Sequence, residues 1–337
     1  MKMLVTGATG FAGGHLARAL VREGHAVRAM VRRPADAREL AEAGIELVAG
    51  DVRDAAAVEC STAGCERVYH LAAVYRDASI ATRDYWDVHV RGTEHVLEAC
   101  AKQGVSRLVH CSTMGVHGHV SSIPSNEESP YNPGDEYQRT KLAAEWRVWE
   151  FSQRHRLPVA VVRPAGIYGP GDLRFLKLFR SIAGGYFIML GSGRTYYHLV
   201  YIDDLVDGFL RCGADDAALG QAFVIGGERY VTLNEFTATI ADVLGVPAPQ
   251  WRVPVWPVYA AGAVCEALCV PLRVRPPLYR RRVDFFTHDR AFDISKARRL
   301  LGYQPRVELR DGLARTAAWY AERGLLPARR SAGSVPA

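Results

Sequence analysis

The chain has 337 residues, of which 49% are hydrophobic and 23% are charged. This length and composition predict a folded globular protein with one large domain or two smaller ones. The formal net charge of +6 is a mild basic excess. It suits an anionic small ligand better than a nucleic-acid groove, which needs a basic face interleaved with aromatic side chains. We therefore expect no nucleic-acid partner.

Cysteine usage indicates a reducing compartment. The seven cysteines are an odd number and form no CxxC pair or histidine-spaced zinc pattern, so we expect free thiols and no metal site. The N-terminal residues lack the features of an export signal. Prolines and Glu266 interrupt the longest apolar stretch, Val253 to Val270, which therefore does not suit a bilayer span. A cytoplasmic protein is expected.

Strand and helix patterns alternate through the first half of the chain. Strands are predicted over Lys2 to Thr6, Ala26 to Val31, Ile45 to Ala49, Arg67 to Ala72, Arg107 to Ser112 and Val159 to Arg163. Helices are predicted over Gly13 to Glu23, Ala35 to Ala43, Tyr85 to Lys102 and Glu136 to His155. The strands are too apolar to have a wet face, so the pattern predicts an α/β fold with a doubly wound parallel sheet of the Rossmann type.

The sequence pattern changes after Tyr168, where glycine-rich turns, prolines and aromatic residues replace the regular alternation of strands and helices. Two further helices are predicted, Asp203 to Cys212 and Leu233 to Leu244. We expect a dinucleotide-binding domain over residues 1–165, to which later segments return. Residues 166–328 are expected to form mostly a smaller, mixed substrate-binding lobe, and residues 329–337 a tail.

Three glycines, Gly7, Gly10 and Gly13, follow the first predicted strand and open the first predicted helix. In this context a turn without Cβ atoms brings backbone N–H groups and the positive helix end against a pyrophosphate. Thr9 and Phe11, in the same turn, are expected to line that site. The alternative is close packing of helix on strand without a ligand.

Arg32 and Arg33 directly follow the second predicted strand, where an acidic residue would bind the 2′-hydroxyl of NAD. Two guanidinium groups suit the extra phosphate of NADP instead, so the cofactor is NADP or NAD with NADP slightly preferred. A solvated basic turn is the alternative. Asp51 and Val52 are expected near the adenine, and the other predicted cofactor contacts are Leu71, Ala72, Ala73, Tyr137, Lys141 and Pro164.

Tyr137 and Lys141 lie four residues apart in a predicted helix and therefore share one face. A nearby ammonium stabilises a phenolate and lowers the phenol pKa from about 10, which would let Tyr137 exchange the proton of an alcohol. Ser112 and Thr113 follow the fifth predicted strand. Thr113 is the first choice, and Ser112 the second, for a hydroxyl that holds the substrate oxygen.

Motifs over nearly the whole chain resemble one superfamily. They include "TGATGFAGG", "GDVRD", "HLAA", "HVRGT", "CSTMGVHG", "YQRTK", "RPAGIYGPGD", "VYIDDLVDG" and "FDISKARRLLGYQP". In this order they are similar to the extended short-chain dehydrogenases/reductases, the NAD-dependent epimerase/dehydratase superfamily. The resemblance implies that Thr113, Tyr137 and Lys141 are the catalytic set, and that Lys141 also holds the nicotinamide ribose.

Several positions depart from the relatives. The superfamily usually has asparagine where this chain has His89, which we expect to bind the loop after the fourth strand. Nucleotide-sugar members place asparagine at Gly166 and arginine at Tyr197, and Arg282 is a candidate to replace part of that charge. Sugar dehydratases carry an acidic pair directly after the catalytic hydroxyl, where this chain has Met114 and Gly115. Elimination of water is therefore disfavoured.

The apolar segment Trp251 to Leu278 is similar to the carboxy-terminal insertion of the 3β-hydroxysteroid dehydrogenase-like branch. In that branch such a segment lines an apolar pocket or touches a membrane surface. A core helix of the smaller lobe is the alternative, and membrane contact is the less favoured expectation. The predicted substrate residues are thus Ser112, Thr113, Gly166, Tyr197 and Arg282.

The leading hypothesis is a dehydrogenase or ketoreductase that interconverts a secondary alcohol and a ketone on an apolar or mixed carbocyclic small molecule. The main alternative is a nucleotide-sugar 4-epimerase with tightly bound NAD. A third is a non-catalytic dinucleotide sensor, which would have no reason to keep the Tyr137 and Lys141 pair. The resemblance also implies a homodimer that pairs through Tyr85 to Lys102 and Glu136 to His155.

Overall fold

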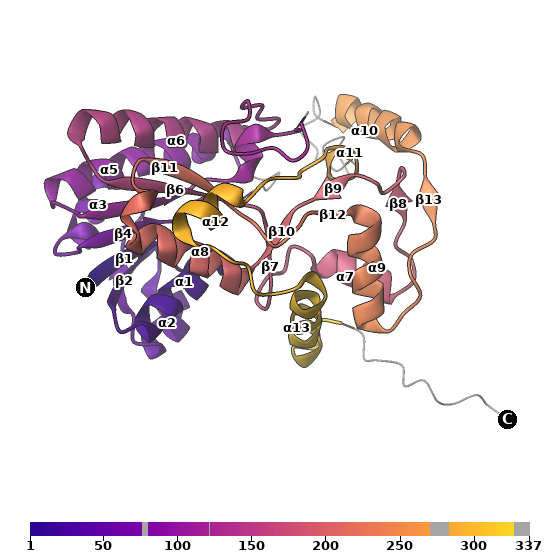
Figure 1. Cartoon of the computed structure of the whole chain (residues 1–337), viewed down its shortest axis with the longest axis horizontal. Coiled ribbons are helices and arrows are strands. Elements are labelled where there is room, and N and C mark those ends of the chain that lie inside the picture. The colour runs from indigo at the N-terminus through magenta and orange to yellow at the C-terminus, as the bar shows by residue number, and fades with distance from the viewer. Residues whose placement is uncertain (76–79, 121, 270–282, 327–337) are drawn as a thin grey trace. The chain divides into compact units, whose positions relative to one another are not determined.

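The computed structural model describes residues 1–75, 80–120, 122–269 and 283–326 (Figure 1). Two compact units make up the chain. The first comprises Met1–Ile167, His198–Tyr230 and Asp289–Arg306, and the second comprises Tyr168–Tyr197, Val231–His288 and Val307–Ala337. The division at residues 165 and 166 stays a prediction, and the predicted tail lies outside the described residues.

A seven-stranded sheet forms the centre of the first unit. Its order is β11-β6-β5-β4-β1-β2-β3, and all neighbours pair in parallel. The strands are β1 (Lys2–Thr6), β2 (Ala26–Val31), β3 (Glu46–Ala49), β4 (Arg67–His70), β5 (Arg107–Cys111), β6 (Val159–Pro164) and β11 (Gln221–Ile225). The order in which successive strands are added reverses between β1 and β4, and sheets of this kind bind ligands at that point, beyond the carboxyl ends of the strands. The predicted doubly wound fold is confirmed.

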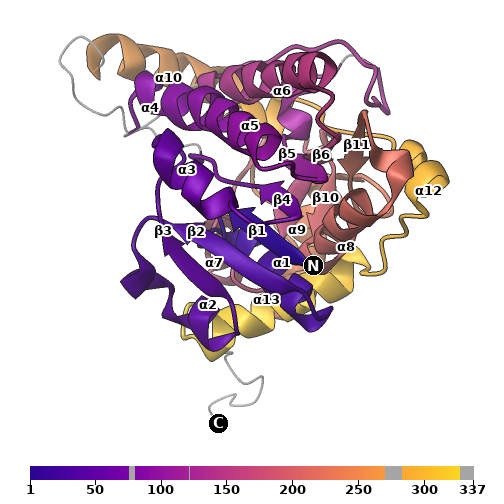
Figure 2. The same cartoon turned by 90° about the vertical axis from the view of Figure 1, so that its left-hand side faces the viewer.

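Helices cover both faces of this sheet. On one face α1 (Phe11–Arg22) packs against α8 (Ile202–Ala214). On the other face α5 (Gly92–Lys102) packs between α3 (Ala55–Thr62) and α6 (Glu136–His155) (Figure 2). Every residue of β6 is buried, as the cover on both faces requires.

Smaller elements complete the first unit and differ in places from the prediction. The stretch predicted as one helix, Tyr85 to Lys102, is α4 (Thr82–Trp86), a π-helical turn η2 (Asp87–Arg91) and α5. The stretch predicted as Ala35 to Ala43 is a 3-10 turn η1 (Pro34–Ala37), with proline as its first residue, followed by α2 (Arg38–Glu42). The remaining elements are β7 (Gly166–Tyr168), β10 (Leu199–Tyr201), η3 (Met114–His117), η4 (Asp216–Ala218) and α12 (Ser295–Leu301).

The second unit has little sheet and a helical core. Its two short ladders are β8 (Met189–Leu190) with β13 (Arg252–Val253) and β9 (Tyr196–Tyr197) with β12 (Val231–Thr232). Buried aromatic rings of α7 (Leu176–Ala183), α9 (Leu233–Leu244) and α13 (Leu309–Glu322) pack together there. The other helices are α10 (Val255–Cys269) and α11 (Asp284–Thr287). No helix within the described residues is long and apolar enough to cross a membrane.

Candidate active site

The glycine turn between β1 and α1 is packed so tightly that side chains do not fit. Gly7 has a φ of +75°, and a Cβ there would lie 2.7 Å from the Ala72 nitrogen. A Cβ on Gly13 would lie 2.2 Å from the Gly7 oxygen, and the Gly10 nitrogen donates to that same oxygen at 3.0 Å.

The start of α1 fits an anionic group. Gly10 is the N-cap of this helix and offers no side chain to its first amides. Thr9 and Gly10 are exposed, and Phe11 is half-buried. An uncapped helix start beside a Cβ-free turn is the arrangement that a pyrophosphate requires, so these residues fit the phosphates of a dinucleotide.

The loop after β4 is held at two backbone amides. The Ala72 N–H donates to Thr6 Oγ1 at 3.3 Å, and the Val74 N–H donates to His89 Nε2 at 3.0 Å. The second bond confirms the expectation that His89 binds this loop. Leu71 and Ala72 are half-buried and Ala73 is exposed, so the loop presents its surface next to the glycine turn.

A buried chain of hydrogen bonds connects this loop to the interior. Thr6 Oγ1 lies 2.7 Å from His70 Nδ1, His70 Nε2 lies 3.0 Å from Thr93 Oγ1, and the Thr93 hydroxyl donates to the His89 carbonyl at 2.5 Å. Because Thr93 gives its proton to that carbonyl, it accepts from His70, whose Nδ1 then accepts from Thr6. Burial lowers the pKa of His70 to about 3, which keeps it neutral.

His89 joins the loop after β4 to α6. Its Nε2 accepts from Val74, so Nδ1 carries the proton and donates to Thr140 Oγ1, 2.8 Å away. Burial, reinforced by the charge of Lys141, lowers the pKa of His89 to about 2. The Tyr137 ring meets the His89 ring edge-on with centroids 5.5 Å apart, and the Tyr75 ring at 5.8 Å. The Tyr137 ring therefore contacts Tyr75, in the loop after β4, and His89, which is hydrogen-bonded to that loop.

Lys141 is bonded to the end of β5, the strand that Thr113 follows. The buried Lys141 ammonium donates to the Cys111 carbonyl at 2.6 Å, two residues before Thr113. Burial lowers the pKa of Lys141, while the charge of Glu145 opposes that shift. The half-buried Thr113 Oγ1 accepts from the Gly115 amide at 3.0 Å.

Ser112 is placed differently from Thr113. It is buried, and its hydroxyl donates to Glu145 Oε2 at 2.5 Å. Gly166 lies in β7, and its amide donates to the His198 carbonyl at 2.9 Å. In the second unit, the Tyr197 ring contacts the Phe285 ring at 5.2 Å and the Phe236 ring at 6.4 Å. Arg282 lies outside the described residues.

The two predicted phosphate-binding arginines have different surroundings. Arg33 forms an ion pair with Asp36 at 2.7 Å. Arg32 is exposed and makes no hydrogen bond or ion pair with any residue that the structure describes. Asp51 pairs with Arg53 at 2.7 Å, which lowers the pKa of the Asp51 carboxyl. Val52, in the turn after β3, and Pro164, the last residue of β6, are both buried.

Sequence reasoning missed a buried ion pair next to these residues. Glu145 on α6 and Arg163 on β6 pair directly, with 0% and 2% of their side chains exposed. Two patterns could have revealed it: Glu145 continues the spacing of Tyr137 and Lys141 by another four residues, and Arg163 interrupts an otherwise apolar strand.

The chain is similar to a known family and to individual relatives over most of its length. The model described as the NAD dependent epimerase/dehydratase family matches residues 3–226. The chain is 33% identical to 2-alkyl-3-oxoalkanoate reductase from Stenotrophomonas maltophilia, over 94% of this chain and 99% of that protein. It is 30% identical to 3β-hydroxysteroid dehydrogenase/Δ5→4-isomerase from Mycobacterium tuberculosis, over 95% of this chain and 90% of that protein.

A solved structure shows the same fold. The UDP-glucuronic acid 4-epimerase from Bacillus cereus, in complex with NAD, has a TM-score of 0.78 at 23% identity, covering 96% of this chain and 99% of that one. The resemblance inferred from the motifs is confirmed by the family match and by these relatives. The chain is therefore a member of the NAD-dependent epimerase/dehydratase family.

Proposed function

We propose that this protein is an NAD(P)-dependent reductase or dehydrogenase that interconverts a ketone and a secondary alcohol on a largely apolar small molecule. One observation carries the proposal: Lys141 bonds the carbonyl two residues before Thr113 and lies one helical turn after Tyr137. The ammonium is thus bonded to the strand that Thr113 follows, and the Tyr137 ring contacts Tyr75 in the loop after β4. Two relatives of similar length are named as a ketoacid reductase and a hydroxysteroid dehydrogenase.

The side chains then have distinct roles. Thr113 Oγ1 accepts a hydrogen bond from the Gly115 amide. Its hydroxyl proton is then the one that donates to the substrate oxygen. Tyr137 gives its phenolic proton to that oxygen during reduction and takes it back during oxidation. The Lys141 ammonium stabilises the phenolate electrostatically. When bound, the dinucleotide supplies or accepts the hydride, and the glycine turn with the start of α1 holds its phosphates.

The residue at position 197 favours a reductase over a nucleotide-sugar epimerase. Its phenol ring packs among Phe236 and Phe285 instead of supplying a cation for a diphosphate. Met114 and Gly115 likewise offer no acidic pair for elimination. A sugar diphosphate would find less charge here than its recognition requires.

The proposal is tested by cofactor turnover. Purified protein is mixed with NADPH or NADH and a 3-ketosteroid or a 2-alkyl-3-oxo acid, and absorbance of the reduced cofactor is followed. We expect one equivalent of cofactor oxidised per equivalent of alcohol formed. Tightly retained NAD with no net turnover, together with interconversion of UDP-glucose and UDP-galactose, would establish the epimerase instead.

We also propose a preference for NADP that depends on Arg32. The Arg32 guanidinium has no hydrogen bond or ion pair within the described residues and suits a 2′-phosphate, whereas Arg33 is engaged by Asp36. The Arg32→Glu variant should raise the KM for NADPH by about 10- to 100-fold, because a charge-assisted hydrogen bond contributes roughly 1.5–3 kcal/mol. Arg33→Glu is the matched control and should have the smaller effect. An equal change in the KM values for NADH and NADPH would contradict this assignment.

We propose a cytoplasmic homodimer that pairs through the α4 to α5 segment and α6. Exposed indole rings support this, since Trp86 and Trp146 on these helices are 42% and 54% exposed. Sedimentation of the wild-type chain and of Trp146→Ala measures the association directly.

A further inference from the structure

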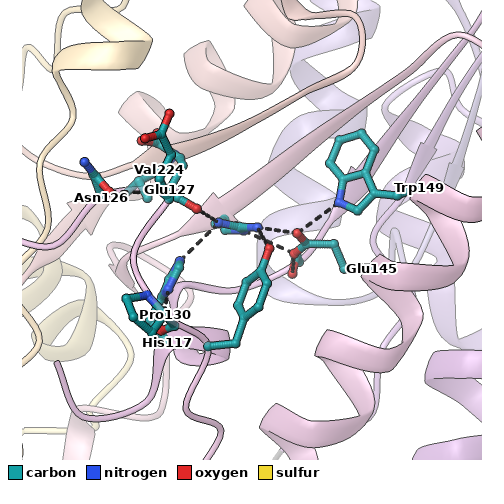
Figure 3. Close-up of polar contacts among 11 residues, drawn as sticks. His117, Asn126, Glu127, Pro130, Glu145, Trp149 and Val224 are labelled. Atoms are coloured by element: carbon teal, nitrogen blue, oxygen red, sulfur yellow. Dashed lines mark hydrogen bonds and ion pairs between the residues drawn. The ribbon is translucent and has the colours of Figure 1, made fainter.

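The structure leaves Glu145 and Arg163 without a part in the proposed chemistry, although both are almost fully buried. Taking two charges out of water carries a desolvation cost that is repaid only where the two ions pair closely and their remaining polar atoms find hydrogen-bond partners. The presence of a buried ion pair at this position therefore requires a structural or functional explanation. Figure 3 shows the polar contacts of the pair and its neighbours, in which Glu145 and Trp149 lie on the right and His117 and Glu127 lie on the left.

The Glu145 carboxylate is fully occupied by donors. Arg163 Nε donates to Oε2 at 3.2 Å, and Arg163 Nη2 donates to Oε1 in a bidentate arrangement. Ser112 Oγ donates to Oε2 at 2.5 Å, and Trp149 Nε1 donates to Oε1 at 3.3 Å. A carboxylate with this many partners has one orientation. Residue 112 is thereby fixed to α6, the helix that carries Tyr137.

The other side of the Arg163 guanidinium holds a second segment. Nη1 donates to the Glu127 carbonyl at 2.8 Å and to His117 Nε2 at 3.1 Å, and Nη2 donates to Tyr131 Oη at 2.7 Å. Because arginine only donates, His117 accepts at Nε2 and is neutral. Burial and the charge of Arg163 lower the pKa of His117 in agreement with this. The ring of His117 also stacks on Tyr131.

Ser112 and His117 bracket the turn that begins with Thr113. Thr113 is the N-cap of η3 (Met114–His117), so the ion pair binds the residue just before the proposed substrate hydroxyl and the last residue of the turn after it. Glu145 at the same time lies two helical turns after Tyr137 on α6. The ion pair thus touches both elements that carry the reacting hydroxyls while touching neither hydroxyl itself.

We propose that Glu145 and Arg163 are positioning residues, a clamp that holds residues 112–117 at both ends and fixes the Thr113 hydroxyl relative to the Tyr137 phenol. This inference rests on the proposed function for its catalytic consequence. A displacement of about 1 Å in a reacting group costs on the order of 10²-fold in rate. Loosening either end of the clamp should therefore lower kcat while leaving cofactor binding intact.

The test loosens each end without removing the ion pair. Ser112→Ala deletes one hydroxyl, and His117→Phe keeps the stacking on Tyr131 while deleting the acceptor. Each variant should lower kcat about tenfold or more, with the KM for NADPH unchanged. Ser61→Ala is the matched control, because Ser61 is also buried and donates to a helix carbonyl, that of Ala57, at 2.7 Å. It should leave kcat unchanged.

A mutant cycle separates positioning from general loss of structure. If the clamp acts through Thr113, Ser112→Ala should lower kcat far less in a Thr113→Val background than in the wild type. Equal losses in both backgrounds would overturn the proposal. Glu145→Gln is not used alone, since it leaves the Arg163 charge buried and unpaired.

An NMR measurement tests the clamp without requiring enzyme activity, so the clamp and the proposed function can fail independently. The ¹³C-methyl NMR signal of Thr113, assigned with Thr113→Val, should shift or broaden in Ser112→Ala and in His117→Phe and stay in place in Ser61→Ala. If wild-type protein oxidises no NADPH, the proposed function fails, whereas the methyl signal still tests the clamp. An unchanged signal in both variants would show that the ion pair does not hold this segment.

Discussion

Replacing Tyr137 with phenylalanine should lower the kcat of ketone reduction by about 10²- to 10⁴-fold, the range of general acid–base contributions. The substitution removes the phenolic oxygen and leaves the ring, so the edge-on contacts with His89 and Tyr75 are kept. Cofactor affinity should therefore change little. Reduced-cofactor absorbance gives the rate, and quenching of protein fluorescence on addition of NADPH gives the affinity.

A tyrosine outside the site provides the control. Tyr186 lies in the second unit with 64% of its surface exposed, so Tyr186→Phe deletes an equivalent hydroxyl without touching the proposed acid. Its kcat should equal that of the wild type. Full activity in Tyr137→Phe would remove the proton-transfer assignment, and it would favour a sensor that binds the dinucleotide without chemistry.

Acidification should unfold this protein well before its carboxylates titrate. His70 and His89 have pKa values near 3 and 2 in the folded protein because burial disfavours their charged forms. In the unfolded chain a histidine titrates near pH 6.5. The unfolded state therefore binds protons first as the pH falls, so this stability is complete above about pH 6.5 and is lost below it.

The expected loss is large. Each histidine that is protonated only in the unfolded state lowers the free energy of unfolding by about 1.4 kcal/mol per pH unit. Two such groups lower it by about 5 kcal/mol between pH 6.5 and 4.5, which is comparable to the whole stability of many domains. Urea unfolding followed by circular dichroism at several pH values measures this slope.

The His89→Asn variant tests whether His89 binds one of the protons that the unfolded state takes up below pH 6.5. An asparagine can accept from the Val74 amide and donate to Thr140 without titrating. This variant should reduce the slope below pH 6.5 by about 1.4 kcal/mol per pH unit, which corresponds to one proton. His155→Asn, at an exposed position at the end of α6, is the control. A slope that His89→Asn leaves unchanged would contradict the account of the buried histidines.

The fold was predictable because its evidence is local in the sequence. Apolar strands such as Val159 to Arg163 alternate with amphipathic helices such as Glu136 to His155, and this alternation specifies a parallel sheet. The seventh strand, β11, was not predicted. It follows irregular sequence after residue 168, and its place beside β6 depends on pairing over a long separation that no local pattern records.

The motifs of the site could be predicted from the sequence, whereas the buried residues that hold them in place could not. Helical spacing puts Tyr137 and Lys141 on one face, and glycine chemistry identifies the turn at Gly7. In contrast, whether Ser112 or Thr113 turns inward depends on the buried partner that each finds, here Glu145 for Ser112. Arg163 is 18 residues from Glu145 on another element, so the sequence patterns can single out each residue but do not show that the two form a pair.

The interleaving of the two units limits how this chain can be cut and recombined. The first unit uses three separate stretches, and the segments 168–197 and 231–288 are inserted between them. A truncation after residue 167 would therefore remove β11, α8 and α12 from the sheet unit along with the insertions. A chimaera that exchanges the second unit with that of a relative has to transplant both inserted segments together with the stretch that carries α13, and leave residues 198–230 in the recipient.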